Sequence, residues 1–233
     1  MDSIIFRQLS ELAQSFGKIG LKPVVCGGLA VYLHFYQSQD ETQRMIRTTN
    51  DVDLMLTPTQ VLEKSCRNAI AEIITETLNY VVCEEAKHFQ FEKAPAQRLD
   101  VLIPRIPDCD ITDYRVKLVR SKLHGHLTEE ACFIEEDLKT IMLSEFLPGT
   151  GNLEIAIPSL TNMLILKLFA FSDRYTGQRQ DVARAAAHAW DIYIIATLAN
   201  PADYHQGQKF LSRHADSDII KTSHRTGFHL PRK

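Results

Sequence analysis

The sequence predicts an α+β fold, in which a mixed sheet with flanking helices precedes a C-terminal helical region. Two observations predict it. Up to residue 157, short strand-like apolar runs alternate with segments whose apolar residues recur at helical spacing. From residue 158 onward, the periodic segments have helical spacing. We therefore expect one domain over residues 1–157 and a helical domain with a basic tail over residues 158–233.

The first domain should begin with a helix and continue with strands and helices in alternation. In chain order, we expect a helix over 4–16, a strand over 23–26, a helix over 29–36, a strand over 51–56, a helix over 58–78, and strands over 80–83, 88–92 and 98–103. Gly17 supplies the stop of the first helix. The pair Gly27-Gly28 joins the first strand to the next helix.

The helix expected over 58–78 begins at a strong start signal. Thr57 can act as its N-cap, and Pro58 suits the first helical position, where its missing N–H costs nothing. Leu62 is among its expected buried residues. Residues 105–153 have irregularly spaced apolar residues, so we assign no elements there.

The second domain reads as a series of helices. Ser159 can cap a helix that runs to about Arg174, and Gly177 breaks it. An alanine-rich segment over 181–198 predicts a second helix, and Pro201 starts a third.

Composition excludes several classes of protein. The formal net charge of -3 gives no global basic field, so nucleic acid would have to bind to local patches. The 5 cysteines are scattered and odd in number, which argues against a disulfide framework and favours the reducing cytoplasm. No apolar run reaches the roughly 20 residues that cross a bilayer, so we expect no membrane association.

Three aspartates are the candidate reaction centre. Side chains at i and i+2 of a strand share a face, so Asp51 and Asp53 present two carboxylates to one side. Asp100 interrupts an otherwise apolar strand, where an unpaired carboxylate would be costly to bury. Three such oxygen donors suit Mg²⁺ or Mn²⁺. Taken alone, however, an acidic pair more often lies on a solvated strand edge.

The glycine pair upstream favours a functional site over a solvated strand edge. Gly27-Gly28 between a strand and a helix lets the backbone approach a phosphate closely, with the helix N-terminal amides facing its charge. A glycine pair by itself is more often a tight turn. Followed by a loop and then by the segment Arg47 to Asp53, the combination indicates a nucleotide site.

Two segments carry a resemblance to a known family. V-C-G-G-L-A-V-Y-L-H followed by R-T-T-N-D-V-D-L-M resembles the first motif of nucleotidyltransferases of the AbiEii/AbiGii toxin family, within the DNA polymerase beta-like superfamily. The segment P-S-L-T-N-M-L-I-L-K-L-F-A-F-S-D-R looks like the family's helical segment with its lysine and arginine. The resemblance implies a catalytic nucleotidyltransferase domain over residues 1–157.

The resemblance also implies site residues. It assigns Gly27, Gly28, Lys167 and Arg174 to nucleotide binding, and Asp51 and Asp53 to the metal. We add Asp100 as the third metal ligand and Thr49 as a further nucleotide contact. The expected catalytic residues are Asp51, Asp53, Asp100 and Asp191. Without the resemblance, Lys167 and Arg174 would be interpreted as surface residues. Gly28 departs from the serine of many superfamily members. The later acid of the family pattern is either Asp181 or Asp191, and Asp191 could equally be the partner of a nearby basic residue.

The expected function is transfer of a nucleoside monophosphate from an NTP to a hydroxyl acceptor. The resemblance makes tRNA a candidate acceptor, a cognate antitoxin protein a candidate partner, and a toxin-antitoxin or phage-defence system the setting. Basic residues over 115–126 and from 205 onward could contact RNA, although solvated basic faces are somewhat more probable. The alternatives are a small-molecule nucleotidyltransferase of the antibiotic-modifying type and a catalytically silent nucleotide-binding protein. We expect no zinc site, because His124 and His126 have no cysteine or acid at zinc-site spacing.

Overall fold

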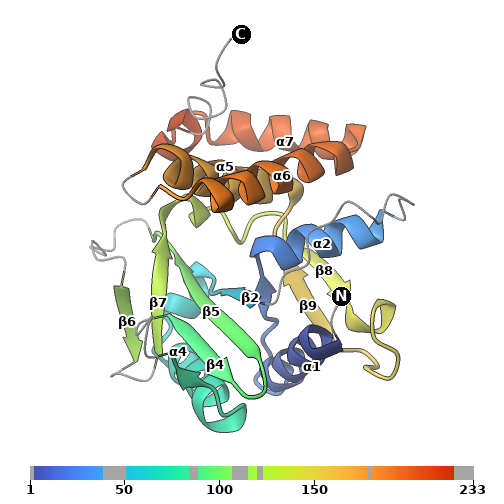
Figure 1. Cartoon of the computed structure of the whole chain (residues 1–233), viewed down its shortest axis with the longest axis vertical. Helices are drawn as coiled ribbons and strands as arrows, with labels where there is room; N and C mark the ends of the chain where they lie inside the picture. Colours follow the sequence, from blue (N-terminus) through green and yellow to red (C-terminus); the bar gives the residue numbers. More distant parts are fainter. Residues whose placement is uncertain are drawn as a thin grey trace. The chain divides into compact units, whose positions relative to one another are not determined.

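The computed structural model describes residues 3–38, 51–83, 89–106, 115–119, 123–177 and 180–222. The chain forms two compact units (Figure 1). The first comprises Met1–Ala30 and Arg47–Pro158, and the second comprises Val31–Ile46 and Ser159–Lys233. The division into two domains at residue 157 stays a prediction.

Among the described residues, nine strands form a mixed sheet in the first unit. The strands are β1 (Val24–Val25), β2 (Asp51–Met55), β3 (Val81–Val82), β4 (Gln90–Lys93), β5 (Gln97–Pro104), β6 (Arg115–Val119), β7 (Leu123–Thr128), β8 (Lys139–Met142) and β9 (Glu154–Ile157). Their order is β3-β4-β5-β2-β1-β9-β8, with β7 pairing β5 and β6 pairing β7 (Figure 1). The pairs β2–β5, β5–β7 and β1–β9 are parallel and the others antiparallel. The predicted α+β class with a mixed sheet is confirmed.

Helices flank this sheet and make up most of the described second unit. They are α1 (Ser3–Gly17), α2 (Gly27–Gln37), α3 (Pro58–Leu62), α4 (Lys64–Glu72), the π-helix η2 (Ile73–Thr77), the short 3₁₀ helices η3 (Glu129–Ala131) and η4 (Leu143–Glu145), and α5 (Leu160–Thr176), α6 (Val182–Leu198) and α7 (Pro201–Arg213). Helix α1 contacts β2, β5 and β9, and its residues Leu9, Leu12 and Phe16 are fully buried. In the second unit, α5 packs against α6.

The single helix predicted over 58–78 is wrong in its middle. Thr57 does cap α3, in a capping box with Gln60, but the helix ends at Leu62 because Glu63 adopts an extended conformation. The Arg67 guanidinium donates to the carbonyls of Val61 and Leu62, which satisfies acceptors left over at that helix end. The break changes the phase of the helical faces. Leu62, expected to be buried, lies at the end of α3 and is 55% exposed.

The predicted starts of the later helices are confirmed by their caps. The Ser159 hydroxyl accepts from the Asn162 backbone at the start of α5, and the Asp181 carboxylate accepts from the Arg184 backbone at the start of α6. Asn200 caps α7 directly before Pro201. These side chains occupy helix N–H groups that have no partner within the helix.

The central strands have one apolar face and one polar face. On β2, Val52 and Leu54 are fully buried, whereas Asp51 and Asp53 are partly exposed. On β5, Leu99 and Val101 are buried in the same alternation. One face of the central strands therefore packs into the core, and the other carries the acidic side chains.

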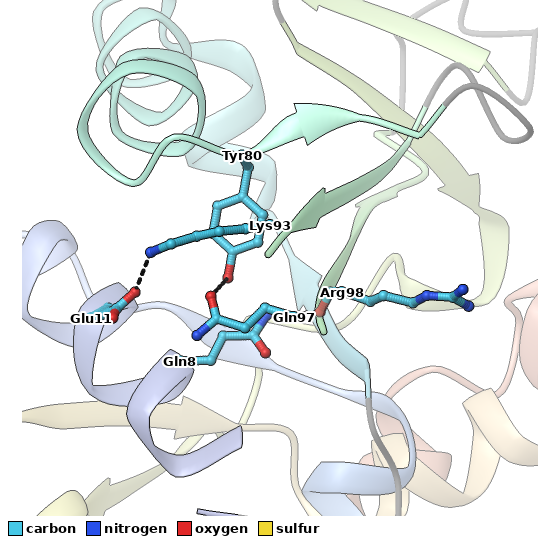
Figure 2. Close-up of polar contacts among 6 residues, drawn as sticks. All are labelled: Gln8, Glu11, Tyr80, Lys93, Gln97 and Arg98. Atoms are coloured by element: carbon cyan, nitrogen blue, oxygen red, sulfur yellow. Dashed lines mark hydrogen bonds and ion pairs between the residues drawn. The ribbon is translucent and has the colours of Figure 1, made fainter. Parts of the chain in front are cut away.

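Polar contacts on the core face fasten α1 to the β4–β5 hairpin (Figure 2). Gln8 donates through Nε2 to the Arg98 carbonyl at 2.7 Å, Tyr80 donates its hydroxyl to Gln97 Oε1 at 3.3 Å, and Lys93 pairs with Glu11 at 2.7 Å. Since Gln8 and Gln97 are buried, these bonds satisfy Gln8 Nε2 and Gln97 Oε1, which would otherwise lose their water. They also hold the backbone of β5 just before Asp100.

No helix in the described ranges combines the length and the apolar character that a membrane span requires.

Candidate active site

The three predicted carboxylates lie together on the polar face of β2 and β5. In the parallel register of these strands, Asp53 stands opposite Asp100 and Asp51 stands opposite Arg98. Residues directly opposite in a ladder share a face and lie about 5 Å apart, and alternate residues of one strand share that face too. The register therefore puts Asp51, Asp53 and Asp100 on one surface, as the sequence predicted.

Gly27 fits against the carboxylate of Asp53. The Cys26 N–H donates to the Asp53 carbonyl at 2.8 Å, which brings the end of β1 beside β2. Gly27 then has φ +68°, and a Cβ added there would lie 1.6 Å from Asp53 Oδ2. A side chain at this position would meet both a strained backbone and an occupied volume. The glycine is thus required by the close approach of the carboxylate.

Helix α2 begins at this contact, with Gly27 and Gly28 in its first turn. The first amides of a helix have no partner within the helix, and the helix dipole makes this end attractive to anions. A phosphate and the Asp53 carboxylate would compete for the same positive end unless a cation lay between them. The arrangement suits a triphosphate bound as its metal complex.

Asp100 is the most perturbed of the carboxyls. Burial raises its pKa to about 7, the hydrogen bond that Gln90 Nε2 donates to Asp100 Oδ2 at 2.9 Å lowers it, and the nearby charges of Asp53 and Asp51 raise it. Arg98 lowers it slightly. Three acids on one partly buried surface thus repel one another, and a bound cation would relieve that repulsion.

The donor chemistry of these residues fits a divalent metal ion. Carboxylate oxygens are the ligands that Mg²⁺ and Mn²⁺ prefer. The pKa of Asp100 is raised first by burial, and the nearby charges of Asp53 and Asp51 add to that effect. Within the described ranges, no three His, Cys, Asp or Glu side chains already converge into a ligand cluster. The metal roles of Asp51, Asp53 and Asp100 therefore stay predictions, supported by register and charge.

The predicted residues of the second unit form a different structure. Lys167 Nζ and Asp191 Oδ2 are 2.6 Å apart, and the two side chains are only 7% and 5% exposed. The interpretation of Lys167 as a surface residue is wrong, and Asp191 is the partner of a basic residue, the alternative left open by the sequence. Arg174 is partly exposed, with Nε 3.9 Å from Asp173. Roles of Lys167, Arg174 and Asp191 toward a nucleotide stay predictions.

Three further residues complete the account of the site. Thr49, predicted to contact the nucleotide, lies outside the described residues. The sequence did not predict roles for Gln90 and Arg98, although both flank Asp100 in the structure. Arg98 precedes Asp100 by two positions and so shares its face, which the alternation of a strand could have revealed. Gln90 could not be found this way, because its position depends on the pairing of β4 with β5.

The solved structures similar to this chain include two of ANT(2'')-Ia and one of a nucleotidyltransferase-like protein. A crystal structure of ANT(2'')-Ia in complex with adenylyl-2''-tobramycin aligns with a TM-score of 0.49 and 14% identity, over 91% of this chain and 99% of that one. A solution structure of the antibiotic-resistance factor ANT(2'')-Ia gives 0.44 and 13%, over 93% and 99%. An antigenic nucleotidyltransferase-like protein from Paracoccidioides brasiliensis gives 0.43 and 13%, over 93% and 91%.

No family model matches the chain, and no curated protein matches it. Because the identities of the solved structures are this low and their TM-scores lie below 0.5, we base the function on the geometry of the site alone.

Proposed function

We propose that the chain is a divalent-metal-dependent nucleotidyltransferase, which moves a nucleoside monophosphate from an NTP to a hydroxyl acceptor. One observation carries the proposal. Asp53 and Asp100 stand opposite each other on parallel strands, Asp51 shares their face, and Gly27 fits against Asp53 at the start of α2. Acids for a cation and a helix start for phosphates thus occur at one place.

The glycine turn supplies the nucleotide side of the proposed site. The first amides of α2 would donate to the triphosphate, and the missing side chain of Gly27 leaves room for Asp53 beside them. Asp51, Asp53 and Asp100 would hold Mg²⁺ or Mn²⁺. When bound, the cation neutralises phosphate charge and stabilises the charge that develops during phosphoryl-type transfer.

Asp100 belongs to the acceptor side of the proposed site. It lies on β5, which is separated from β1 and its glycine turn by β2. The acceptor oxygen forms a bond to the α-phosphorus as the bond to pyrophosphate breaks, and the hydroxyl proton passes to a base. Asp100 is the carboxylate that we assign to orient this hydroxyl, with Gln90 holding it by a hydrogen bond. No covalent intermediate on the protein is required.

Replacing each aspartate by asparagine tests the proposal. We expect Asp51→Asn, Asp53→Asn and Asp100→Asn each to reduce transfer by about 10³-fold, since each removes charge from the reaction centre. Transfer is measured as pyrophosphate release and product labelling with each NTP in Mg²⁺. The matched control is Glu72→Gln, an exposed acid on α4 that should leave transfer unchanged. Undiminished transfer by Asp53→Asn and Asp100→Asn would reject the assignment, as would a wild type that binds NTP without turnover.

The identity of the acceptor and the biological setting rest on the family resemblance. Similarity to the AbiEii/AbiGii motifs supports tRNA as the acceptor, a cognate antitoxin as a protein partner, and a role as the toxin of a toxin-antitoxin or phage-defence system. Incubation with labelled NTP and total RNA should label tRNA in the wild type and not in Asp53→Asn. Label that appears only in a small molecule would replace the tRNA proposal with the antibiotic-modifying alternative.

A further inference from the structure

Arg98 is the one cation on the carboxylate face of β2, β4 and β5 within the described residues. Its register partners are Asp51 on one side and Glu92 on the other. The remaining polar residues of this face are Asp53, Asp100 and Gln90, none of which carries a positive charge. The Arg98 side chain therefore has acidic neighbours on both adjacent strands and is exposed to solvent.

Within the described residues, the Arg98 guanidinium forms no ion pair with its register partners Asp51 and Glu92. Directly opposite residues lie about 5 Å apart, well within the reach of an arginine side chain. No ion pair joins Arg98 to Asp51 or Glu92 in the described structure, and the side chain is exposed. Its donors are therefore available to a ligand.

The backbone that carries Arg98 is held in place from the other side of the sheet. Buried Gln8 donates to the Arg98 carbonyl at 2.7 Å. Figure 2 shows the Arg98 side chain extending away from Gln8, Gln97 and Tyr80. A fixed backbone with an exposed guanidinium is more typical of a residue that binds a ligand than of one that stabilises the fold.

The order of the strands indicates whether Arg98 lies beside the NTP or beside the acceptor. The glycine turn follows β1, the first acids lie on β2, and Arg98 lies one strand further, on β5. In phosphoryl-type transfer, the attacking and leaving oxygens are roughly in line on opposite sides of phosphorus. Pyrophosphate leaving over the β1 turn thus requires the acceptor to approach from β5. Arg98 then stands on the acceptor side of the carboxylates.

We propose that Arg98 contacts a phosphate of the acceptor, and that the acceptor is an oligonucleotide whose terminal hydroxyl, next to its own phosphodiester, attacks the α-phosphorus of the NTP as pyrophosphate leaves. This inference rests on the proposed function. A guanidinium at this place favours an anionic acceptor by a charge-assisted hydrogen bond and disfavours a polycationic one by repulsion. The rival role for Arg98 is simple neutralisation of the acidic face, which would act on nucleotide and metal binding instead.

Oligonucleotide binding without NTP or metal tests the contact independently of turnover. The probe is a short fluorescein-labelled single-stranded oligoribonucleotide with a free 3′ hydroxyl, followed by anisotropy over a series of salt concentrations. We expect Arg98→Gln to weaken binding about tenfold, as for loss of a hydrogen bond to a charged group. The slope of log affinity against log salt should fall by about 0.7, the value for one single-strand phosphate contact. Arg98→Lys should retain part of the affinity.

Transfer kinetics supply the second readout. With Mg²⁺ and NTP, Arg98→Gln should raise the KM for the oligonucleotide about tenfold and leave the KM for NTP unchanged. Arg7→Gln, an exposed arginine on α1, is the matched control and should behave as the wild type in both assays. A nucleoside acceptor without phosphate should be used equally by the wild type and Arg98→Gln.

Each outcome decides between the two proposals. Equal oligonucleotide affinity and salt slope in the wild type and Arg98→Gln would overturn the Arg98 assignment, and so would a parallel rise in the KM for NTP. A wild type that transfers to tobramycin but neither binds nor labels the oligonucleotide would overturn the assignment and keep the proposed function. A wild type that shows Arg98-dependent oligonucleotide binding but no transfer to any acceptor would keep the contact and remove the proposed function.

Discussion

Two groups of acidic side chains differ in how their charge is balanced. On β2 and β5, Asp51, Asp53 and Asp100 share one partly buried face, and burial with the neighbouring charges raises the pKa of Asp100 to about 7. Between α5 and α6, Asp191 is almost completely buried, but Lys167 lies 2.6 Å away. The first group has an excess of like charge, and the second contains its own counter-ion.

The difference separates a ligand site from a structural pair. Carboxylates that share one face repel one another, and a bound cation would relieve that repulsion. A buried pair with one charge of each sign needs no ligand, and removing either partner leaves the other uncompensated. Substitutions should accordingly act on function in the first group and on stability in the second.

Breaking the Lys167–Asp191 pair should give the largest change in stability. Lys167→Met leaves the Asp191 carboxylate buried without its cation, and we expect the free energy of unfolding to fall by about 3–5 kcal/mol. Denaturant unfolding measures it. The double variant Lys167→Met/Asp191→Asn should recover much of this loss, because no lone charge then remains buried. A single variant as stable as the wild type would contradict the structural role of the pair.

Gly27→Ala should give the next largest change. An alanine at φ +68° is strained, and its Cβ would overlap Asp53 Oδ2, so we expect a loss of about 2–3 kcal/mol together with reduced transfer. Gly20→Ala is the matched control, since Gly20 has φ +73° but open space around its Cα. The loss of stability in Gly20→Ala should therefore reflect backbone strain alone. If both alanines cost the same, the close approach of Asp53 to Gly27 would be disproved.

The free energy of unfolding should depend on pH, because folding raises the pKa of Asp100. The carboxyl titrates near 3.8 when unfolded and at about 7 when folded, so the folded state binds the proton more tightly between these values. Stability is therefore greatest below about pH 4 for this group and falls as pH rises to about 7 in the absence of divalent metal.

Asp100→Asn isolates this contribution, because asparagine does not titrate. Measured in a chelator by thermal unfolding across this pH range, the variant should gain stability over the wild type as pH rises. Asp137→Asn, at an exposed position outside the site, should track the wild type. Parallel curves for Asp100→Asn and the wild type would show that folding does not raise the pKa of Asp100.

Local signals in the sequence predicted most elements of the fold. Ser159 and Pro201 mark helix starts that the structure confirms, because caps and proline act within one turn. The interruption at Glu63 was missed, since it depends on Arg67 reaching back to the end of α3. Strands β6 to β8 were also missed. Their segments have no periodic pattern of their own, and their positions come from pairing of β7 with β5 and β6 and of β8 with β9.

The sequence predicted which site residues share a face of one strand, but not how the strands pair. The i, i+2 spacing of Asp51 and Asp53 gave their common face, and the structure adds the register that puts Asp100 opposite Asp53. The burial of Lys167 could not be read from the sequence, because its partner Asp191 lies on another helix. Long-range pairing therefore decides which charged residues face a ligand and which face each other.

The smallest expected effect concerns the cap of the helix that carries Lys167. Ser159→Ala removes the hydroxyl that accepts from the Asn162 backbone, at 3.3 Å, and should cost about 1 kcal/mol. Ser159→Asp should keep the cap and the stability, which makes it the matched control. Since the cap lies two turns before Lys167, the loss should add to that of Lys167→Met without coupling. A coupled loss in the double variant would mean that the cap positions the buried ion pair, and the pair would then depend on the start of α5 as well as on its own two charges.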